Sequence, residues 1–474
     1  MFLGLDLGTS NVKAIVADSD GQVVSSGSAQ VKTDYLPDGG VEQNIADICS
    51  AAMTAMANAA QGCDLGSIQA IGVSSQGGAL QILGRNGSPV GPVISWMDSR
   101  SAPYNRRETA SLGRDWFGAH AGHRACGTAV GQLLRLAEAG RLLPGFRAGF
   151  VGDQIVRRLC GRAAHDATSL SLAMLYNPSL GRADPGLLNR LGLSDERLPD
   201  LLSAETPAGT LLNEVAEETG LPRNIPVSPA VHDQYAAALG CGAVADGDVM
   251  FGAGTAWVLL AVTDRLPKPA SDTAFVCRHP VEGLYGQILS LGNGGSAISW
   301  ALAAMQLGQP DNDEMDRILS SAPPGCDGLR CKPLFASAGP GSSGAQLTGL
   351  RLSHKPAHII RAVIEGLAFE LAKRLEMLKE AGMGVQRLQM CGPAASGEVT
   401  PQIVCDVTGV PVERVSVADA SALGAAVLAR RLVQPDHSLE QISKQMAGPS
   451  DTVTVSKNRS LYASAVEQYL AESG

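Results

Sequence analysis

Aromatic side chains are scarce in this chain of 474 residues, since Phe, Trp and Tyr together make up only 4% of it. Positive charge is also in deficit, with 37 Lys and Arg against 46 Asp and Glu and a formal net charge of −9. A protein that binds nucleic acid needs aromatic rings for stacking or a clustered basic surface for the phosphate backbone. Composition and charge therefore disfavour a nucleic acid or an anionic membrane as partner.

Paired cysteines and apolar runs of membrane length are missing as well. The ten cysteines are scattered, without a Cys-x-x-Cys motif or a nearby His pair at zinc spacing, which indicates reduced thiols in the core. The chain begins directly on an apolar strand without a basic leader, and it has no run of about 18 uncharged apolar residues. We expect a cytoplasmic protein without a membrane partner.

What the chain has is the length and composition of a two-domain globular protein. It is 45% hydrophobic and 18% charged, and its 55 Gly and 26 Pro supply many turns. A chain this long exceeds one ordinary core and fits two domains of about 200 residues each. Short β-rich runs followed by amphipathic helical stretches predict sheets with helices packed on their faces.

The first motif is a strand that runs into a glycine turn. Residues 1–13 read Met-Phe-Leu-Gly-Leu-Asp-Leu-Gly-Thr-Ser-Asn-Val-Lys, with one carboxylate, Asp6, inside the apolar strand. The N–H and hydroxyl groups of such a turn suit phosphate oxygens, and the carboxylate suits the water shell of a metal ion. Because Asp-Leu-Gly-Thr also ends ordinary hairpins, this motif alone leaves phosphate binding and a plain hairpin equally open.

The same motif occurs a second time. From Met250 the chain reads Met-Phe-Gly-Ala-Gly-Thr, and the position that corresponds to Asp6 is Gly252. Three residues keep one constant offset between the copies: Gly254, Thr255 and Asp264 repeat Gly8, Thr9 and Asp18. The repeat predicts two turns that hold opposite sides of one nucleotide, with the acid for the metal in the first turn only. Two similar hairpins by chance are the alternative.

Two further motifs bring polar groups to strand ends. A short β pattern ends at Ala230-Val231-His232-Asp233-Gln234, where a helix begins, so Asp233 either faces a cleft or caps the helix. A later strand leads into Gly392-Pro393-Ala394 and then a helix, which is typical of an anion- or nucleotide-binding turn. The apolar stripe of residues 356–380 predicts a core helix.

Together these motifs resemble those of the FGGY carbohydrate kinases, above all their xylulokinase-like branch, over nearly the whole chain. The most specific stretch, Ala345–Leu350 followed by His358–Glu365, is similar to the C-terminal signature of that family. The resemblance implies an α/β fold with two actin-like (ribonuclease-H-like) domains around an ATP and sugar cleft. It implies a sugar-binding domain over 1–243, a nucleotide-binding domain over 244–433, and a C-terminal tail over 434–474 that packs on the core.

The resemblance also implies roles for single residues. Asp233 resembles the catalytic aspartate, and Asp6 resembles the acid that acts on Mg²⁺ through water. The implied nucleotide-binding residues are Asp6, Thr9, Ser10, Asn11, Lys13, Gly254, Thr255, Gly392, Pro393 and Ala394. The implied sugar-binding residues are Gln76, Gly77, Trp96, Asp98, Arg100, Asp233 and Gln234. Trp96 equally fits a core position, and Arg100 equally fits a surface ion pair.

The chemistry agrees with these roles. Phosphoryl transfer requires a positioned in-line attack, charge neutralisation and one acceptor for the hydroxyl proton. An aspartate with an ordinary pKa of about 3.9 is ionised at neutral pH and serves as that acceptor when the proton leaves late. We therefore expect a monomer or homodimer that uses ATP and Mg²⁺ to phosphorylate a sugar hydroxyl, with Asp233 as general base.

Three segments differ from the pattern that the resemblance implies. Pro393 stands where a glycine triplet is usual and removes an N–H, and residues 336–345 lack a Gly-Glu-Arg-x-Pro element. Gly77-Gly78 replaces the bulkier residues expected at the xylulose pocket, so the resemblance implies a ketose such as D-xylulose or another pentulose and leaves open which one. An actin- or chaperone-like ATPase and a catalytically silent regulator that binds nucleotide or sugar are the alternatives.

Overall fold

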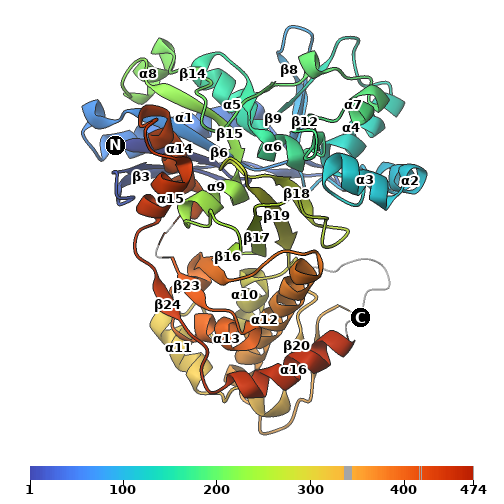
Figure 1. Ribbon diagram of the computed structural model, residues 1–474, viewed down its shortest axis with the longest axis vertical. Coiled ribbons are helices and arrows are strands. Elements are labelled where there is room, and N and C mark those ends of the chain that lie inside the picture. The colour runs from blue at the N-terminus through green and yellow to red at the C-terminus, as the bar shows by residue number, and fades with distance from the viewer. Residues whose placement is uncertain (336–343, 416, 418, 473–474) are drawn as a thin grey trace. The chain divides into compact units, whose positions relative to one another are not determined.

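Figure 1 shows the computed structural model, which describes residues 1–335, 344–415, 417 and 419–472. Most of the segment 336–345 that lacks the expected element therefore lies outside the described residues. The chain divides into two compact units. Unit 1 comprises Met1–Ala245, Thr263–Gln287 and Asp419–Gly448, and unit 2 comprises Asp246–Val262, Ile288–Ala418 and Pro449–Gly474. The domain limits expected from the sequence stay a prediction.

The main sheet of unit 1 has the strand order β13-β10-β15-β6-β1-β2-β3, and β14 pairs with β15. Its strands are β1 (Phe2–Leu7), β2 (Asn11–Ala17), β3 (Val23–Gln30), β6 (Ala70–Ser75), β10 (Ala164–His165), β13 (Asp200–Leu201), β14 (Gly209–Thr210) and β15 (Pro226–His232). β1 runs antiparallel to β2 and parallel to β6, which in turn runs parallel to β15. The carboxyl ends of β1, β6 and β15 therefore share one edge of the sheet, the edge where ligands bind in open α/β sheets.

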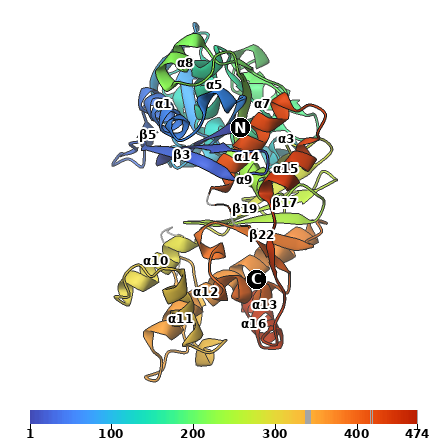
Figure 2. The ribbon, with the colours of Figure 1, turned by 90° about the vertical axis from the view of Figure 1, so that its left-hand side faces the viewer.

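Helix α14 (Ala420–Val433) lies directly on this sheet because the strands beneath it carry glycines. A Cβ at Gly4 of β1 would stand 1.9 Å from the carbonyl oxygen of Ala422, and a Cβ at Gly72 of β6 would stand 1.8 Å from that of Ala425. Figures 1 and 2 both show α14 and α15 (Leu439–Ala447) beside α9 (Asp233–Gly240). The helix that follows Asp233 thus packs beside a helix from the far end of the chain.

The rest of unit 1 surrounds this layer. A second sheet has the order β4-β5-β8-β7-β9, formed by β4 (Asp34–Tyr35), β5 (Val41–Gln43), β7 (Leu80–Leu83), β8 (Pro89–Ile94) and β9 (Arg147–Phe150). The other helices are α1 (Ile45–Gln61), α2 (Ala102–Leu112), α3 (Arg114–Ala121), α4 (Thr128–Glu138), α5 (Val151–Cys160), α6 (Ala167–Leu172), α7 (Pro185–Arg190) and α8 (Asn213–Thr219). β11 (Tyr176–Asn177) and β12 (Arg182–Ala183) form a small hairpin.

Unit 2 repeats the plan of the first sheet. Its strands follow the order β17-β16-β22-β23-β24, with β16 antiparallel to β17 and parallel to β22. The hairpin of β16 and β17 thus stands to β22 as the hairpin of β1 and β2 stands to β6. The bounds are β16 (Asp248–Ala253), β17 (Trp257–Thr263), β22 (Arg387–Cys391), β23 (Val412–Arg414) and β24 (Asp451–Val453). The repeat that the sequence predicts is a repeat of structure.

The helices of unit 2 are α10 (Gly295–Ala304), α11 (Asn312–Ser320), α12 (Pro356–Glu380), α13 (Val399–Thr408) and α16 (Arg459–Glu472), labelled in Figure 2. α12 has the bounds that its apolar stripe predicts, and its interior is buried. α16 is tied to α12 by a buried network in which Tyr462 donates a hydrogen bond to Glu365 over 2.5 Å and Arg361 pairs with Glu365 over 2.8 Å.

The remaining strands are three to six residues long. They are β18 (Phe275–Arg278), β19 (Tyr285–Ser290), β20 (Arg330–Lys332) and β21 (Gln346–Thr348). The mixed architecture confirms the expected α/β class. All ten cysteines carry free thiols, and among the described residues no helix is both long and apolar enough to cross a bilayer.

Candidate active site

The turn between β1 and β2 is held by a network of neutral polar groups. Gly8 is required there because a Cβ would stand 2.7 Å from the carbonyl oxygen of Asn11. The Thr9 hydroxyl donates to Gln76 Oε1 over 3.1 Å and accepts from Trp96 Nε1 over 3.0 Å. Gln43 completes the network, since its Nε2 donates to the Thr9 carbonyl over 2.7 Å and its Oε1 accepts from Gln76 Nε2 over 3.2 Å.

This network joins three of the residues expected on the nucleotide or the sugar, Thr9, Gln76 and Trp96. The Trp96 side chain is 53% exposed, which rules out the core position that the sequence left open. Gln43 carries no local sequence signal, because the two site residues that it contacts, Thr9 and Gln76, lie more than thirty residues away along the chain.

Acidic side chains gather beyond the end of β1. Asp6 accepts a hydrogen bond from the Ser74 hydroxyl over 2.7 Å, as the pairing of Asp6 with Ser74 in adjacent strands requires. Burial, then the charges of Asp419 and Asp233, raise the pKa of Asp6 to about 7. The charges of Asp233 and Asp419 therefore both act on Asp6, and we call these three residues the acid cluster.

Among the described residues, Lys13 is a cation that lies beside the acid cluster. Lys13 Nζ lies 2.7 Å from Asp419 Oδ2, so the lysine expected on a phosphate is paired with the residue that caps α14. A cluster of carboxylates with one lysine still lacks positive charge. Hard oxygen ligands are those that Mg²⁺ prefers, so the donor set fits this ion. In the described part of the chain, no group of three or more acidic, His or Cys side chains could hold a metal ion directly. Binding of Mg²⁺ by Asp6 through water stays a prediction.

Asp233 stands where β15 ends and α9 begins, as the sequence predicts. Its side chain is 27% exposed, and His232 Nε2 lies 3.2 Å from its Oδ1. His232 itself is buried, and burial lowers the pKa of its imidazole. The His232 N–H donates to the Thr168 hydroxyl over 2.9 Å, which fixes the end of the strand. A neutral, anchored imidazole therefore holds one side of the Asp233 carboxylate.

Gly77 explains one departure from the xylulokinase-like pattern. A Cβ at Gly77 would stand 2.4 Å from Cδ2 of His232 and 2.7 Å from Cβ of Leu172. The His232 ring thus occupies the space that a side chain at position 77 would need. Gly78 adopts φ +72°, a conformation that a bulkier residue rarely adopts. Gly77 is therefore explained by the side chains packed against it, and Gly78 by its backbone conformation.

Asp98 and Arg100 form an ion pair in this structure. Arg100 Nη2 lies 2.6 Å from Asp98 Oδ2 and 2.6 Å from Glu42 Oε1. Asp98 also accepts from the Val41 N–H and from Gln132 Nε2, each over 2.9 Å. These contacts use most of the hydrogen-bonding capacity of Asp98, whose side chain is fully buried. Contact of this pair with a sugar stays a prediction.

A pocket of about 560 Å³ lies within unit 2 and contains most of the other expected nucleotide residues. Gly254 and Thr255 of the second hairpin, the start of α10, and Pro393 and Ala394 line it. Apolar side chains of α10, α11 and α12 complete the wall. Its volume falls in the range of about 300–1,000 Å³ that small-molecule sites occupy.

The second hairpin is fixed to the helix beside it. The N–H groups of Gly295 and Ser296 donate to the carbonyl oxygens of Gly254 and Thr255 over 2.9 and 3.0 Å. The first N–H groups of α10 are thereby used. Thr255 itself is exposed at the pocket edge, so its hydroxyl is available to a phosphate oxygen.

The proline in the third turn is accommodated. Pro393 occupies the first position of a 3₁₀ helix, Pro393–Ala395, where a missing N–H leaves no hydrogen bond unmade. Gly392 adopts φ +91°, and a Cβ there would stand 3.1 Å from the backbone of Ala253 at the end of β16. The turn and the second hairpin therefore border one pocket despite the substitution.

The remaining expected residues lie near these groups. Ser10 is exposed in the first turn, Asn11 opens β2, and Gln234 is in the first turn of α9. Sequence reasoning missed Gln43, His232 and Asp419. Of these, Asp419 had a usable signal, an aspartate directly before a run of small helical residues.

The repeated hairpin, the pocket beside it and the acid at the strand edge define an α/β protein that binds a nucleotide. Residues 1–240 match the model of the N-terminal domain of the FGGY family of carbohydrate kinases, and residues 249–432 match that of the C-terminal domain. The chain belongs to the FGGY family of carbohydrate kinases, enzymes that phosphorylate sugars with ATP. The resemblance predicted from the motifs is confirmed.

Individual relatives differ in their substrates. A glycerol kinase from Deinococcus radiodurans is 28% identical over 94% of this chain and 91% of its own length. A xylulose kinase from Bacillus subtilis is 24% identical over 94% of this chain and 90% of its own. Among solved structures, a xylulose kinase from Rhodospirillum rubrum superimposes with a TM-score of 0.87 at 22% identity, covering 99% of this chain and 97% of that one.

A gluconate kinase from Lactobacillus acidophilus has the same fold, with a TM-score of 0.89 at 21% identity and coverage of 98% of this chain and 96% of that one. These superpositions confirm the predicted actin-like fold class. The sequence and structure comparisons together do not separate one substrate from another, since kinases named for glycerol, xylulose and gluconate are all similar to this chain.

Proposed function

We propose that this chain transfers the γ-phosphoryl group of ATP to a hydroxyl of a small, uncharged polyol or ketose, with Asp233 as the general base. The observation that carries the proposal is the placement of Asp233. Its partly exposed carboxylate is oriented by His232 and lies close enough to Asp6 to raise the pKa of that residue. Phosphoryl transfer requires a base for the hydroxyl proton and an acid that holds a metal ion, and Asp233 and Asp6 would supply these two groups.

The assignment of the base rests on the surroundings of Asp233. One carboxylate oxygen faces the neutral imidazole of His232, and a partly exposed side chain can accept a proton from a substrate hydroxyl. Thr255, Gly254 and the Gly392–Ala394 turn would hold the nucleotide. Asp6, with Asp233 and Asp419 nearby, would hold Mg²⁺ through water. When bound, this ion supplies positive charge for the β- and γ-phosphate oxygens.

The neutral network around Thr9 favours an uncharged substrate. Its side chains offer amide, hydroxyl and indole groups, which suit sugar hydroxyls. The two cations of the site motifs, Lys13 and Arg100, are paired with carboxylates. A sugar acid such as gluconate would need an unpaired cation. Glycerol and pentuloses such as D-xylulose remain the first compounds to test.

The test is ADP release, coupled to an indicator reaction, across polyols, pentuloses, hexuloses and sugar acids. At least one uncharged compound should stimulate ADP release, and Asp233→Asn should abolish that stimulation while ATP still binds. Asp436→Asn, at an exposed position, is the matched control and should behave as wild type. ADP release that no sugar or polyol stimulates would contradict the proposal and favour a sugar-independent ATPase.

A further inference from the structure

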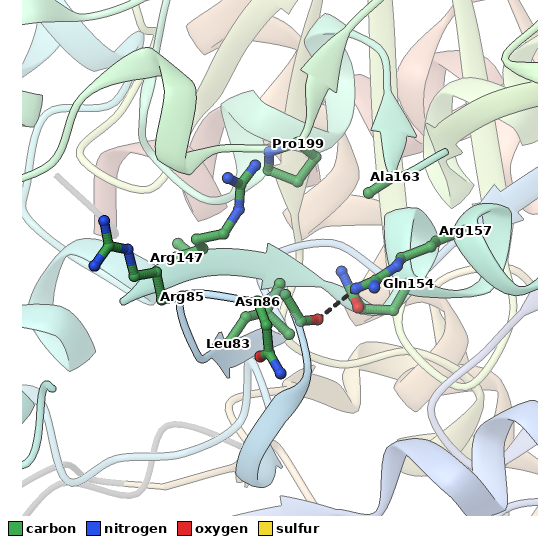
Figure 3. Close-up of a pocket in the computed structure, with 10 residues that line it drawn as sticks. Leu83, Arg85, Asn86, Arg147, Gln154, Arg157, Ala163 and Pro199 are labelled. Atoms are coloured by element: carbon green, nitrogen blue, oxygen red, sulfur yellow. Dashed lines mark hydrogen bonds between the residues drawn. The ribbon is translucent and has the colours of Figure 1, made fainter. Parts of the chain in front are cut away.

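Three arginines surround a hollow in unit 1 that the proposed function does not use. The hollow has a volume of about 200 Å³ and lies between the turn after β7, the start of β9 and helix α5. Figure 3 shows Arg85 and Arg147 on one side and Arg157 with Gln154 on the other. None of its lining residues is acidic, and none belongs to the candidate active site.

These arginines lack the carboxylate partners that their neighbours have. On the same helix Arg158 pairs with Glu214 and Glu218 over 2.8 and 2.7 Å, and just beyond it Arg162 pairs with Asp200 over 2.6 Å. Arg85, Arg147 and Arg157, in contrast, form no ion pair with any residue that the structure describes. In a chain of net charge −9, a cluster of three unpaired arginines is a local exception.

Glycine turns hold two of these side chains in position. Gly87 adopts φ +78°, and a Cβ there would stand 2.8 Å from Nη1 of Arg157, which donates to the Gly87 carbonyl. The stem of Arg85 packs on Gly145, whose Cβ would lie 3.6 Å from Arg85 Cγ and Cδ. Arginines held in this way lose less conformational entropy when they bind a ligand.

The carboxylate of Asp153, which feels the charge of Arg157, is occupied by other partners. Asp153 on α5 is buried, with its oxygens accepting from Gln154 Nε2 over 2.5 Å and from the Phe150 N–H over 2.7 Å. Burial raises the pKa of Asp153 to about 7, against the opposing effects of these hydrogen bonds and of Arg157. The carboxylate oxygens of Asp153 therefore accept hydrogen bonds from the Phe150 N–H and from Gln154.

We propose that this arginine hollow binds the phosphate group of a small phosphorylated molecule, or free inorganic phosphate. Guanidinium groups bind phosphate oxygens with paired hydrogen bonds, and the Arg157 N–H groups beyond Nη1 remain for this purpose. At about 200 Å³ the hollow fits one phosphate group and is smaller than the ~300 Å³ at which sites for whole drug-sized ligands begin. The rest of a phosphorylated ligand would extend into solvent.

The site is independent of the proposed catalytic role. It is built on α5, which packs on β15, the strand that ends at His232. Because phosphate binding is measured without catalysis, the binding test is separable from the kinase assay.

The experiment measures the melting temperature of the full-length protein with its nucleotide pocket saturated by a non-hydrolysable ATP analogue. Inorganic phosphate is the first probe, glycerol 2-phosphate is the second, and chloride at equal ionic strength is the blank. The test variant is Arg85→Gln with Arg147→Gln. The matched control is Arg106→Gln with Arg182→Gln, which removes the same charge from exposed positions.

We expect phosphate or the ester to raise the melting temperature of wild type and control above the chloride blank, with an affinity at least tenfold weaker in the test variant. A shift with the ester alone would assign the site to a phosphorylated metabolite, and a shift with both probes to the phosphate group itself. No shift in wild type, or equal shifts in the test variant, would overturn the proposal. If the test variant folds poorly, a phosphate-soaked wild-type crystal without density between Arg147 and Arg157 would overturn it as well.

Discussion

Replacing Asp6 by Asn should make the ligand-free protein more stable and the enzyme less active. Burial and the charges of Asp419 and Asp233 raise the pKa of Asp6 from 3.8 to about 7. Between these two values the folded state binds more protons than the unfolded state, so the stability of wild type falls as the pH rises through this window. Three pKa units correspond to a ceiling of about 4 kcal/mol above pH 7.

The Asp6→Asn variant has no carboxylate to ionise, and its amide oxygen can still accept from Ser74. We expect the variant to exceed wild type by about 2 to 4 kcal/mol near pH 8, and by much less near pH 5. Urea denaturation of the ligand-free protein at both pH values measures the difference. Mg²⁺ should stabilise wild type with nucleotide more than it stabilises the variant, and kcat should fall at least ~100-fold.

Asp184→Asn is the control with the opposite sign. Burial opposes the ionisation of Asp184, but hydrogen bonds from Asn177, the Leu187 N–H and His120 outweigh it and lower its pKa. That variant should therefore lose stability at neutral pH, and the loss should shrink as the pH falls toward and below the lowered pKa. If Asp6→Asn were no more stable than wild type near pH 8, or equally stabilised near pH 5, the acid cluster would not exist as described.

Three substitutions test the packing of the site. Gly77→Ala should displace the His232 ring, since the new Cβ would lie 2.4 Å from it, lowering kcat and costing about 1–3 kcal/mol by urea denaturation. Gly424→Ala should destabilise the packing of α14 on α9 by at least ~2 kcal/mol, because its Cβ would stand 1.7 Å from the Ala236 carbonyl oxygen. Pro393→Ala should leave the KM for ATP within about threefold, because the proline sits where no N–H is needed.

Each of these substitutions has an outcome that contradicts its reasoning. Gly66→Ala, whose Cβ would meet only one carboxylate oxygen at 3.5 Å, is the control for both glycine variants and should be nearly neutral. Wild-type kcat in Gly77→Ala would mean that the His232 ring does not orient Asp233. Wild-type stability in Gly424→Ala would refute close packing of the two helices. A tenfold change in KM for Pro393→Ala would show that the turn contacts the nucleotide through this residue.

Local patterns were enough to predict the motifs and the helices and strands that carry them. The duplicated hairpin was predicted from identical residues at a constant offset, and the structure adds that each hairpin is followed by a parallel strand in the same place. The helix Pro356–Glu380 was predicted with its observed bounds because its stripe is long and its proline marks the first turn. The junction at Asp233 followed from a β pattern that stops directly before a helical one.

What the sequence did not predict depends on contacts between distant residues. The partner of Lys13 is Asp419, which no spacing rule connects with it. The side-chain space at Gly77 is taken up by His232 from another strand, so the glycine looked like an open pocket in the sequence. The side-chain amide of Gln43 reaches Thr9 and Gln76 only after the two sheets of unit 1 have formed.

The central claim is that Asp233 accepts the proton from a neutral hydroxyl substrate during phosphoryl transfer from ATP. The most direct measurement is the ADP-release rate with and without saturating substrate, in wild type and in Asp233→Asn, with nucleotide affinity measured in parallel. The account predicts substrate-stimulated release in wild type, a loss of at least ~1,000-fold in the variant, and unchanged affinity for the nucleotide. Stimulated release that survives in Asp233→Asn would contradict it.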